Sequence, residues 1–80
     1  MPSEATVTIT VKLFASFRRG RFKEASRDYS AGARIADVIA DLGIEPKDIG
    51  MIFVDGKHAD PDRALRAGEA LALFPLLGGG

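Results

Sequence analysis

Apolar and polar residues alternate strictly near the start of the chain, over residues 6–14. One face of that segment carries four apolar side chains, those of Val7, Ile9, Val11 and Leu13. A period of two with many β-branched residues is typical of a strand that buries one face. A weaker strand is predicted over residues 22–29, and the turn at residues 18–21 makes the two strands a hairpin. Residues 30–32 break the second strand.

The pattern changes to a helical period in the middle of the chain. Apolar residues spaced three and four apart form one stripe there, made of Ile35, Val38, Ile39 and Leu42. This spacing predicts an amphipathic helix with one buried face, and Asp37 and Asp41 fall on its solvated side. Gly43 follows the stripe, as expected for a left-handed C-terminal cap. Pro46 keeps the helix from restarting.

Short apolar segments separated by turns fill the rest of the chain. Further strands are predicted at residues 51–54, 57–59 and 70–74. Asp55-Gly56 is a strong tight-turn dipeptide, residues 60–65 form a turn or a short helix, and residues 67–69 turn again. Pro75 ends the last strand because proline has no N–H to donate to a ladder.

This order of elements predicts an α+β fold, in which a sheet of about four to five strands packs on one main helix. The sheet face that meets the helix is expected to carry Val7, Ile9, Val11, Leu13, Ile52, Val54, Leu71 and Leu73. We divide the chain into a flexible lead-in (1–5), one domain (6–75) and a flexible glycine tail (76–80). A chain of 80 residues forms a single domain and cannot enclose a large ligand cavity.

Composition narrows the function further. The 11 Lys and Arg residues balance the 11 Asp and Glu residues, which argues against a nucleic acid or membrane partner. The start of the chain lacks the basic and apolar regions of a signal peptide, so we expect a cytoplasmic protein. The absence of cysteine excludes disulfides, thiolate metal ligands and a catalytic thiol. If this chain carries sulfur, a side chain cannot hold it.

The sequence finishes with the glycine run Gly78-Gly79-Gly80 behind Leu77. Glycine adds no packing and is entropically costly to order, so such a tail is not explained by stability. A glycine tail suits a function in which a bare C-terminal carboxylate enters a narrow site on another protein. The alternative is a frayed terminus or a cloning scar.

Three aromatic residues are predicted to lie together on the face of the sheet that the helix does not cover. By alternation, Phe14, Phe53 and Phe74 all point to that face, and they are close if their strands are neighbours. A large apolar patch usually marks an interface. The alternative is that the rings are covered by the tail or by loops, or are scattered surface residues.

The polar residues are weaker candidates for a functional site than the three aromatic residues. His58 is the only histidine, so it makes a poor zinc site, and no nucleophile accompanies it. It is either a contact at the rim of the interface or a plain surface residue. Arg18, with Arg19 and Arg21, forms either a solvated turn or a docking point for an acidic partner or a phosphate. Asp60 and Asp62 flank a proline and are assigned to turn chemistry.

From about Val7 to Gly80 the chain resembles the ubiquitin-like β-grasp sulfur carriers of the ThiS/MoaD type. These are the small subunit of molybdopterin synthase and the thiamin sulfur carrier. The most specific match is Gly79-Gly80 after a final strand. Supporting matches in register are Gly32-Ala33, Leu42-Gly43, Val54-Asp55-Gly56 and Gly68-Glu69.

The resemblance implies a mixed β-grasp sheet with the first and last strands side by side in its centre. It implies a carrier rather than an enzyme, with no bound cofactor or metal. An E1-like adenylyltransferase (MoeB/ThiF type) would use ATP to adenylate the Gly80 carboxylate, and a persulfide would convert it to a thiocarboxylate. Gly79 would thread the channel of that enzyme. The sulfur would go to the large subunit of molybdopterin synthase or to thiazole synthase.

The resemblance also places Phe14, His58 and Phe74 against the activating enzyme, and we add to this interface Arg18, Phe53, Pro75, Leu76, Leu77 and Gly78. Three features depart from the family pattern. Gly78 is a third glycine, and Leu76-Leu77 replaces a proline and a valine. Arg34 stands where a capping threonine is common, so the helix cap comes from Ser30 or is missing.

Sulfur delivery for molybdopterin synthesis is the preferred function, with the thiamin pathway as its near alternative. A ubiquitin-like modifier, joined through Gly80 to a lysine of another protein, uses the same terminus. A non-covalent β-grasp interaction module is the third possibility, and it predicts that the terminus has no chemical role.

Overall fold

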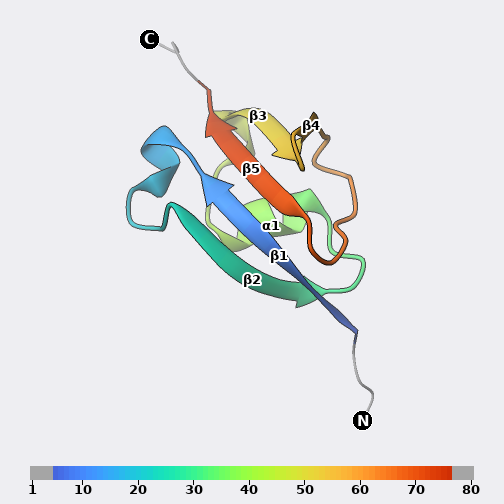
Figure 1. Ribbon diagram of the computed structural model, residues 1–80. Helices are drawn as coiled ribbons and strands as arrows, with labels where there is room; N and C mark the ends of the chain where they lie inside the picture. The colour runs from blue at the N-terminus through green and yellow to red at the C-terminus, as the bar shows by residue number, and fades with distance from the viewer. Residues whose placement is uncertain (1–4, 77–80) are drawn as a thin grey trace.

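The computed structural model describes residues 5–76, which form a five-stranded sheet packed on one α-helix (Figure 1). In chain order the elements are β1 (Thr6–Leu13), the 3-10 helix η1 (Ala15–Arg18), β2 (Glu24–Ser30), α1 (Ile35–Asp41), the 3-10 helix η2 (Pro46–Asp48), β3 (Ile49–Val54), β4 (Lys57–His58) and β5 (Ala70–Pro75). The α+β fold class predicted from the sequence is confirmed.

The strand order β2-β1-β5-β3-β4 brings the first and last strands together in the centre of the sheet. β1 and β5 are parallel, with Val11 paired to Leu71 and Leu13 paired to Leu73, whereas the other neighbouring strands are antiparallel. The sheet is therefore mixed, as the resemblance implied. Because β1 and β5 are parallel, their carboxyl ends meet at the same edge of the molecule (Figure 1).

α1 covers one face of the sheet (Figure 1), and the predicted apolar stripe of the helix faces the core. Ile35, Val38 and Ile39 are buried and Leu42 is half-buried. The predicted sheet face is buried as well, apart from the partly buried Val7. The connecting segments add four more core residues, namely Phe17, Ile44, Ala59 and Leu65.

The cap of α1 comes from within the helix. The Asp37 carboxylate accepts a hydrogen bond from the backbone N–H of Arg34 at 2.9 Å. A cap from Ser30, one of the two predicted alternatives, is wrong, because Ser30 lies in β2 and its carbonyl accepts a hydrogen bond from the N–H of Ala33. At the other end of α1, Gly43 takes the left-handed conformation that was predicted, with φ 71°.

Residues 60–65 satisfy the first donors of the helix. The N–H groups of Ile35 and Ala36 donate to the carbonyls of Arg63 and Pro61 at 3.0 and 2.9 Å. The first N–H groups of a helix lack partners within the helix and need external acceptors. This segment was predicted to form a turn or a short helix, and the structure has a turn there.

Two strands begin at residues other than the predicted ones because of neighbouring turns. β2 begins at Glu24 rather than at Phe22, since the chain leaves the sheet for η1 after Leu13 and no strand remains for Phe22 to pair with. Pro46 opens the short 3-10 helix η2, because its fixed φ suits a first helical position. η2 leads directly into β3, which therefore begins at Ile49 and not at residue 51.

Candidate functional site

The three predicted aromatic residues lie together on the open face of the sheet. The Phe14 and Phe74 rings stack with centroids 4.1 Å apart and an interplanar angle of 8°. Phe53 meets Phe74 edge-on at 5.7 Å. The contact exists because β1 and β5 are adjacent and β3 lies on the other side of β5. Stacked and edge-to-face pairs stabilise aromatic residues beyond their buried area, so the rings form one cluster.

Two aliphatic side chains enlarge this cluster. Met51 is 46% exposed and Leu76 is 60% exposed, and both line a hollow of ≈ 240 Å³ beside Phe14 and Phe74. We call Phe14, Met51, Phe53, Phe74 and Leu76 the tail-end patch. Met51 was missed in the sequence, although alternation with the buried Ile52 would have placed it there.

A second hollow of ≈ 500 Å³ lies on the other side of the stacked rings. Ala70 and Ala72 of β5 leave space at its centre, and Lys12 and Asp55 stand among its lining residues. Apolar hollows with a few charged groups at their margins suit side chains of a partner protein. The tail-end patch is therefore shaped as a stacked aromatic ridge between two hollows.

The rim of the patch contains two of the predicted polar residues. His58 lies edge-on to Phe53 with ring centroids 5.9 Å apart, and it is exposed. The Arg18 guanidinium carbon lies 5.4 Å from the centroid of the Phe14 ring, and its Nε donates to the Leu13 carbonyl at 2.8 Å. Both residues can contact a partner that covers the patch.

The basic turn does not act as one unit. Arg21 donates hydrogen bonds to the carbonyls of Phe17, Leu42 and Gly43, whereas Arg18 donates to the carbonyl of Leu13. These carbonyls belong to η1 and to the end of α1. Arg21 therefore ties the first hairpin to the helix, and docking by Arg18 does not extend to it.

The chain leaves the sheet inside the tail-end patch. Pro75 is the buried last residue of β5, and the N–H of Leu76 donates to the carbonyl of Asp48 at 2.8 Å. The remaining predicted site residues, Leu77, Gly78, Gly79 and Gly80, lie outside the described residues. Whatever follows Leu76 starts from the surface made by the patch.

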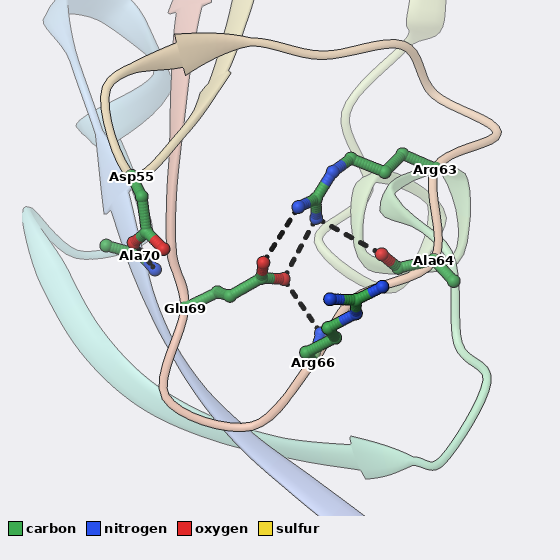
Figure 2. A network of polar contacts seen from close by, with 6 residues as sticks. All are labelled: Asp55, Arg63, Ala64, Arg66, Glu69 and Ala70. Atoms are coloured by element: carbon green, nitrogen blue, oxygen red, sulfur yellow. Dashed lines mark hydrogen bonds and ion pairs between the residues drawn. The ribbon is translucent and has the colours of Figure 1, made fainter.

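The opposite end of the β1–β5 pair holds a polar network that the sequence did not reveal (Figure 2). The buried Glu69 carboxylate accepts two hydrogen bonds from Arg63, at 2.8 and 2.9 Å, and one from the N–H of Arg66 at 2.8 Å. Next to it, the Asp55 carboxylate accepts the N–H of Ala70 at 2.9 Å. No periodicity links the four charged residues, because they come from turns and loops.

Electrostatics marks this network as structural. The hydrogen bonds from Arg63 hold the pKa of Glu69 below its ordinary value of 4.5, against the opposing effect of burial. The backbone N–H of Arg66 lowers this pKa further. Both oxygens of this carboxylate already accept hydrogen bonds from the protein. Glu69 therefore anchors a loop and is poorly suited to act as a general acid or base.

Between residues 5 and 76, no group of three His, Cys, Asp or Glu side chains is arranged to hold a metal ion. No helix in that range is long and apolar enough to cross a bilayer.

Comparison with known proteins agrees with this geometry. A sequence model of the ThiS family matches residues 11–80. The chain is 27% identical to the putative molybdopterin converting factor subunit 1 of Pyrococcus furiosus, with a TM-score of 0.72, over 89% of this chain and 99% of that one. It is also 27% identical to the small archaeal modifier protein SAMP1 of Haloferax volcanii, with a TM-score of 0.70, over 91% and 99% of the two chains.

A more distant likeness is to a protein in the complex of subunits 1 and 2 of the molybdopterin-converting factor of Helicobacter pylori. There the identity is 17% and the TM-score 0.58, over 92% of this chain and 100% of that one, so it shows the fold alone. No match was found among curated proteins. The likenesses confirm the β-grasp fold predicted from the sequence.

Proposed function

Because the chain belongs to the ThiS family, we propose that it is a sulfur carrier whose last residue, Gly80, bears the reactive carboxylate. Proteins of this family are small sulfur carriers or ubiquitin-like proteins and are not themselves catalysts. The observation that carries the proposal is the exit of the chain at Leu76, within the exposed tail-end patch. A partner that covers the patch would receive the residues that follow.

The first chemical step is adenylation. A carboxylate is a poor electrophile, so an E1-like adenylyltransferase would bind ATP and let an oxygen of the Gly80 carboxylate attack the α-phosphorus. Pyrophosphate leaves, and an acyl adenylate remains. The enzyme must exclude water to protect this intermediate. A narrow channel achieves that, and Gly79 and Gly80 would fit it because they have no side chains.

The second step transfers sulfur. The terminal sulfur of a persulfide attacks the acyl carbon, AMP leaves, and an acyl disulfide forms. A second thiol then attacks the donor's original sulfur in this acyl disulfide and forms a new disulfide with it. The two electrons that the attacking thiol gives up reduce the acyl-bound sulfur, which leaves as the thiocarboxylate. ATP and the sulfur donor belong to the enzymes, so this chain needs no bound cofactor. We place these steps in the cytoplasm.

The tail-end patch would serve two partners in turn. Because the tail has one point of exit, the activating enzyme and the sulfur-receiving enzyme must both approach it there. The Phe14–Phe74 ridge would be the common anchor, with His58 and Arg18 at the rim and Pro75, Leu76, Leu77 and Gly78 as the approach to the channel. Aromatic residues at the centre of an interface commonly contribute most of the binding free energy.

We favour molybdopterin synthesis as the pathway, with the large subunit of molybdopterin synthase as the receiving enzyme. The likeness to the putative molybdopterin converting factor subunit of Pyrococcus furiosus supports this choice. Thiazole synthase in the thiamin pathway is the alternative receiver.

A second candidate function is protein modification. The likeness to the small archaeal modifier protein of Haloferax volcanii favours it. The acyl group of Gly80 would then pass from the adenylate to a lysine amine, either directly with loss of AMP or through a thioester whose thiol leaves, and form an isopeptide bond. Tandem mass spectrometry of cell extracts for Gly80 joined to lysine side chains distinguishes a modifier from a carrier.

The proposal is tested by incubating the chain with ATP, its cognate adenylyltransferase and a persulfide donor, and then measuring intact mass. We expect the mass increase that corresponds to exchange of one oxygen for one sulfur. Deletion of Gly80 should abolish it, and omission of ATP is the matched control. An unchanged mass with the cognate enzyme would show that the chain is not a sulfur carrier.

A further inference from the structure

Gly50 differs from the other glycines that the structure describes. Five of them adopt a positive φ and have open space around the position of a Cβ atom: Gly20, Gly32, Gly43, Gly56 and Gly68. Gly50 has no positive φ. A Cβ added to it would lie 2.8 Å from the Pro75 carbonyl oxygen and 3.0 Å from the Leu76 Cα. A glycine is therefore required at position 50 because the backbone of Pro75 and Leu76 approaches it closely, and not because of its φ angle.

The approach occurs at a bulge. Met51 pairs with Phe74, but Ile49 pairs with Pro75, so β3 contains one residue more than β5 at this point. The extra residue is Gly50. Bulges bend a strand and redirect what lies beside it. This bulge faces the last residue of β5, where the chain leaves the sheet.

A hydrogen bond holds the same segment from beside the bulge. Pro75 has no N–H, so the first backbone donor after Phe74 is Leu76, and it donates to the Asp48 carbonyl at 2.8 Å. The Asp48 carbonyl and the bulge at Gly50 together hold the Pro75–Leu76 peptide. We call this arrangement the exit clamp.

We propose that Gly50 is a positioning residue, which sets the direction in which the chain leaves the sheet and so presents the C-terminal carboxylate to the activating enzyme. The inference rests on the proposed function. Four residues follow Leu76, and they can reach about 14 Å from it when extended. With so short a reach, the starting direction decides how often the carboxylate meets ATP in a reactive geometry.

A methyl group at position 50 would disturb this direction. Ordinary contact with a Cβ begins at 3.4 Å, so the Pro75 oxygen at 2.8 Å must move by about 0.6 Å. Pro75 is buried, whereas Leu76 is exposed and held by one backbone hydrogen bond. The strain is therefore relieved by movement of Leu76 and loss of the exit clamp.

Hydrogen exchange tests the clamp without any enzyme. In Gly50→Ala the Leu76 amide should exchange about tenfold faster than in the wild type, because its bond to Asp48 is weakened. Gly32→Ala is the control, since its φ of +91° also strains an alanine, but in open space before α1 and with no contact to Pro75 or Leu76. Unchanged protection of Leu76 in Gly50→Ala would overturn the inference.

Adenylation kinetics test the delivery of the carboxylate. Gly50→Ala should lower kcat about tenfold, as expected for sub-ångström misplacement of a reactive group, and leave KM within about threefold because the stacked Phe14–Phe74 pair of the tail-end patch is not displaced. Gly32→Ala should keep both values. Equal losses of kcat in the two variants would reduce Gly50 to a structural role and contradict the proposal.

A second pair of variants approaches the clamp from the tail and remains informative if Gly50→Ala does not fold. Leu76→Pro removes the N–H that Asp48 accepts, and Leu76→Ala removes the side chain but keeps the N–H. We expect kcat to fall about tenfold further in Leu76→Pro than in Leu76→Ala. Equal kcat values would exclude the clamp. A wild-type chain that is never adenylated would instead overturn the proposed function itself, and the delivery role with it.

Discussion

The two ends of the central β1–β5 pair differ in chemical character, one being apolar and exposed and the other polar and buried. At the tail end, five apolar side chains stand on an open face, and the chain departs among them. At the other end, Glu69 is only 9% exposed and its carboxylate accepts hydrogen bonds from Arg63 and Arg66. Apolar surface left in water is available to a partner, whereas a satisfied buried network is not. Substitutions at the two ends should therefore affect different properties.

Removal of Glu69 should have the largest effect, and it should be on stability. Glu69→Ala leaves the Arg66 N–H and the Arg63 guanidinium without their acceptor, and the loop that holds α1 through Pro61 and Arg63 is loosened. We expect a loss of about 2–3 kcal/mol in the free energy of unfolding, measured by urea denaturation. Loss of a fully buried pair costs more, but the Arg63 side chain is 37% exposed.

The same variant also probes the division between the two ends. Affinity of folded Glu69→Ala for the activating enzyme should match that of the wild type. A parallel loss of affinity would show that the polar end also takes part in recognition, and the contrast between the ends would fail.

Truncation of Phe74 should act mainly on recognition. Phe74→Ala removes the ring that contacts both Phe14 and Phe53. We expect binding of the activating enzyme to weaken by roughly 1–3 kcal/mol, as for an interface anchor, measured by isothermal titration calorimetry. Thr8→Ala is the matched control, because Thr8 is exposed on β1 where the open face is polar. Equal affinities of the two variants would refute the role of the patch.

The difference between the ends also explains what the sequence could predict. Periodicity is local, so alternation was sufficient to place Phe14, Phe53 and Phe74 on one face, and it would have placed Met51 there too. The Arg63–Glu69 contact depends on the path of a loop, which no period encodes. The close approach at Gly50 joins β3 to the end of β5. A glycine inside a strand signals such an approach but does not identify what approaches.

The Glu69 network should also make the free energy of unfolding depend on pH in the acid range. This effect should be smaller than those of Glu69→Ala and Phe74→Ala. The pKa of Glu69 is lowered in the folded protein, so its contribution is present above the ordinary value of 4.5 and is lost as pH falls through the folded-state pKa. Glu69→Gln lacks this titration. We expect the free energy of unfolding of this variant to be lower than that of the wild type by about 1–2 kcal/mol at pH 7.

The difference should shrink as the pH is lowered from about 5 to about 3, because the wild-type carboxyl becomes protonated. Urea denaturation across that range measures it. A gap between the two proteins that stayed constant with pH would mean that Glu69 does not titrate as the network requires.

The smallest effect is expected on the exposed side of α1, away from both ends. Asp41 accepts hydrogen bonds from Arg27 and from the Tyr29 hydroxyl, both at 3.0 Å, and these lower its pKa. Its side chain is nevertheless 50% exposed. Exposed ion pairs contribute little because water screens them, so Asp41→Asn should cost about 0.5 kcal/mol in urea denaturation. A loss as large as that of Glu69→Ala would mean that burial does not separate structural from peripheral polar contacts in this fold.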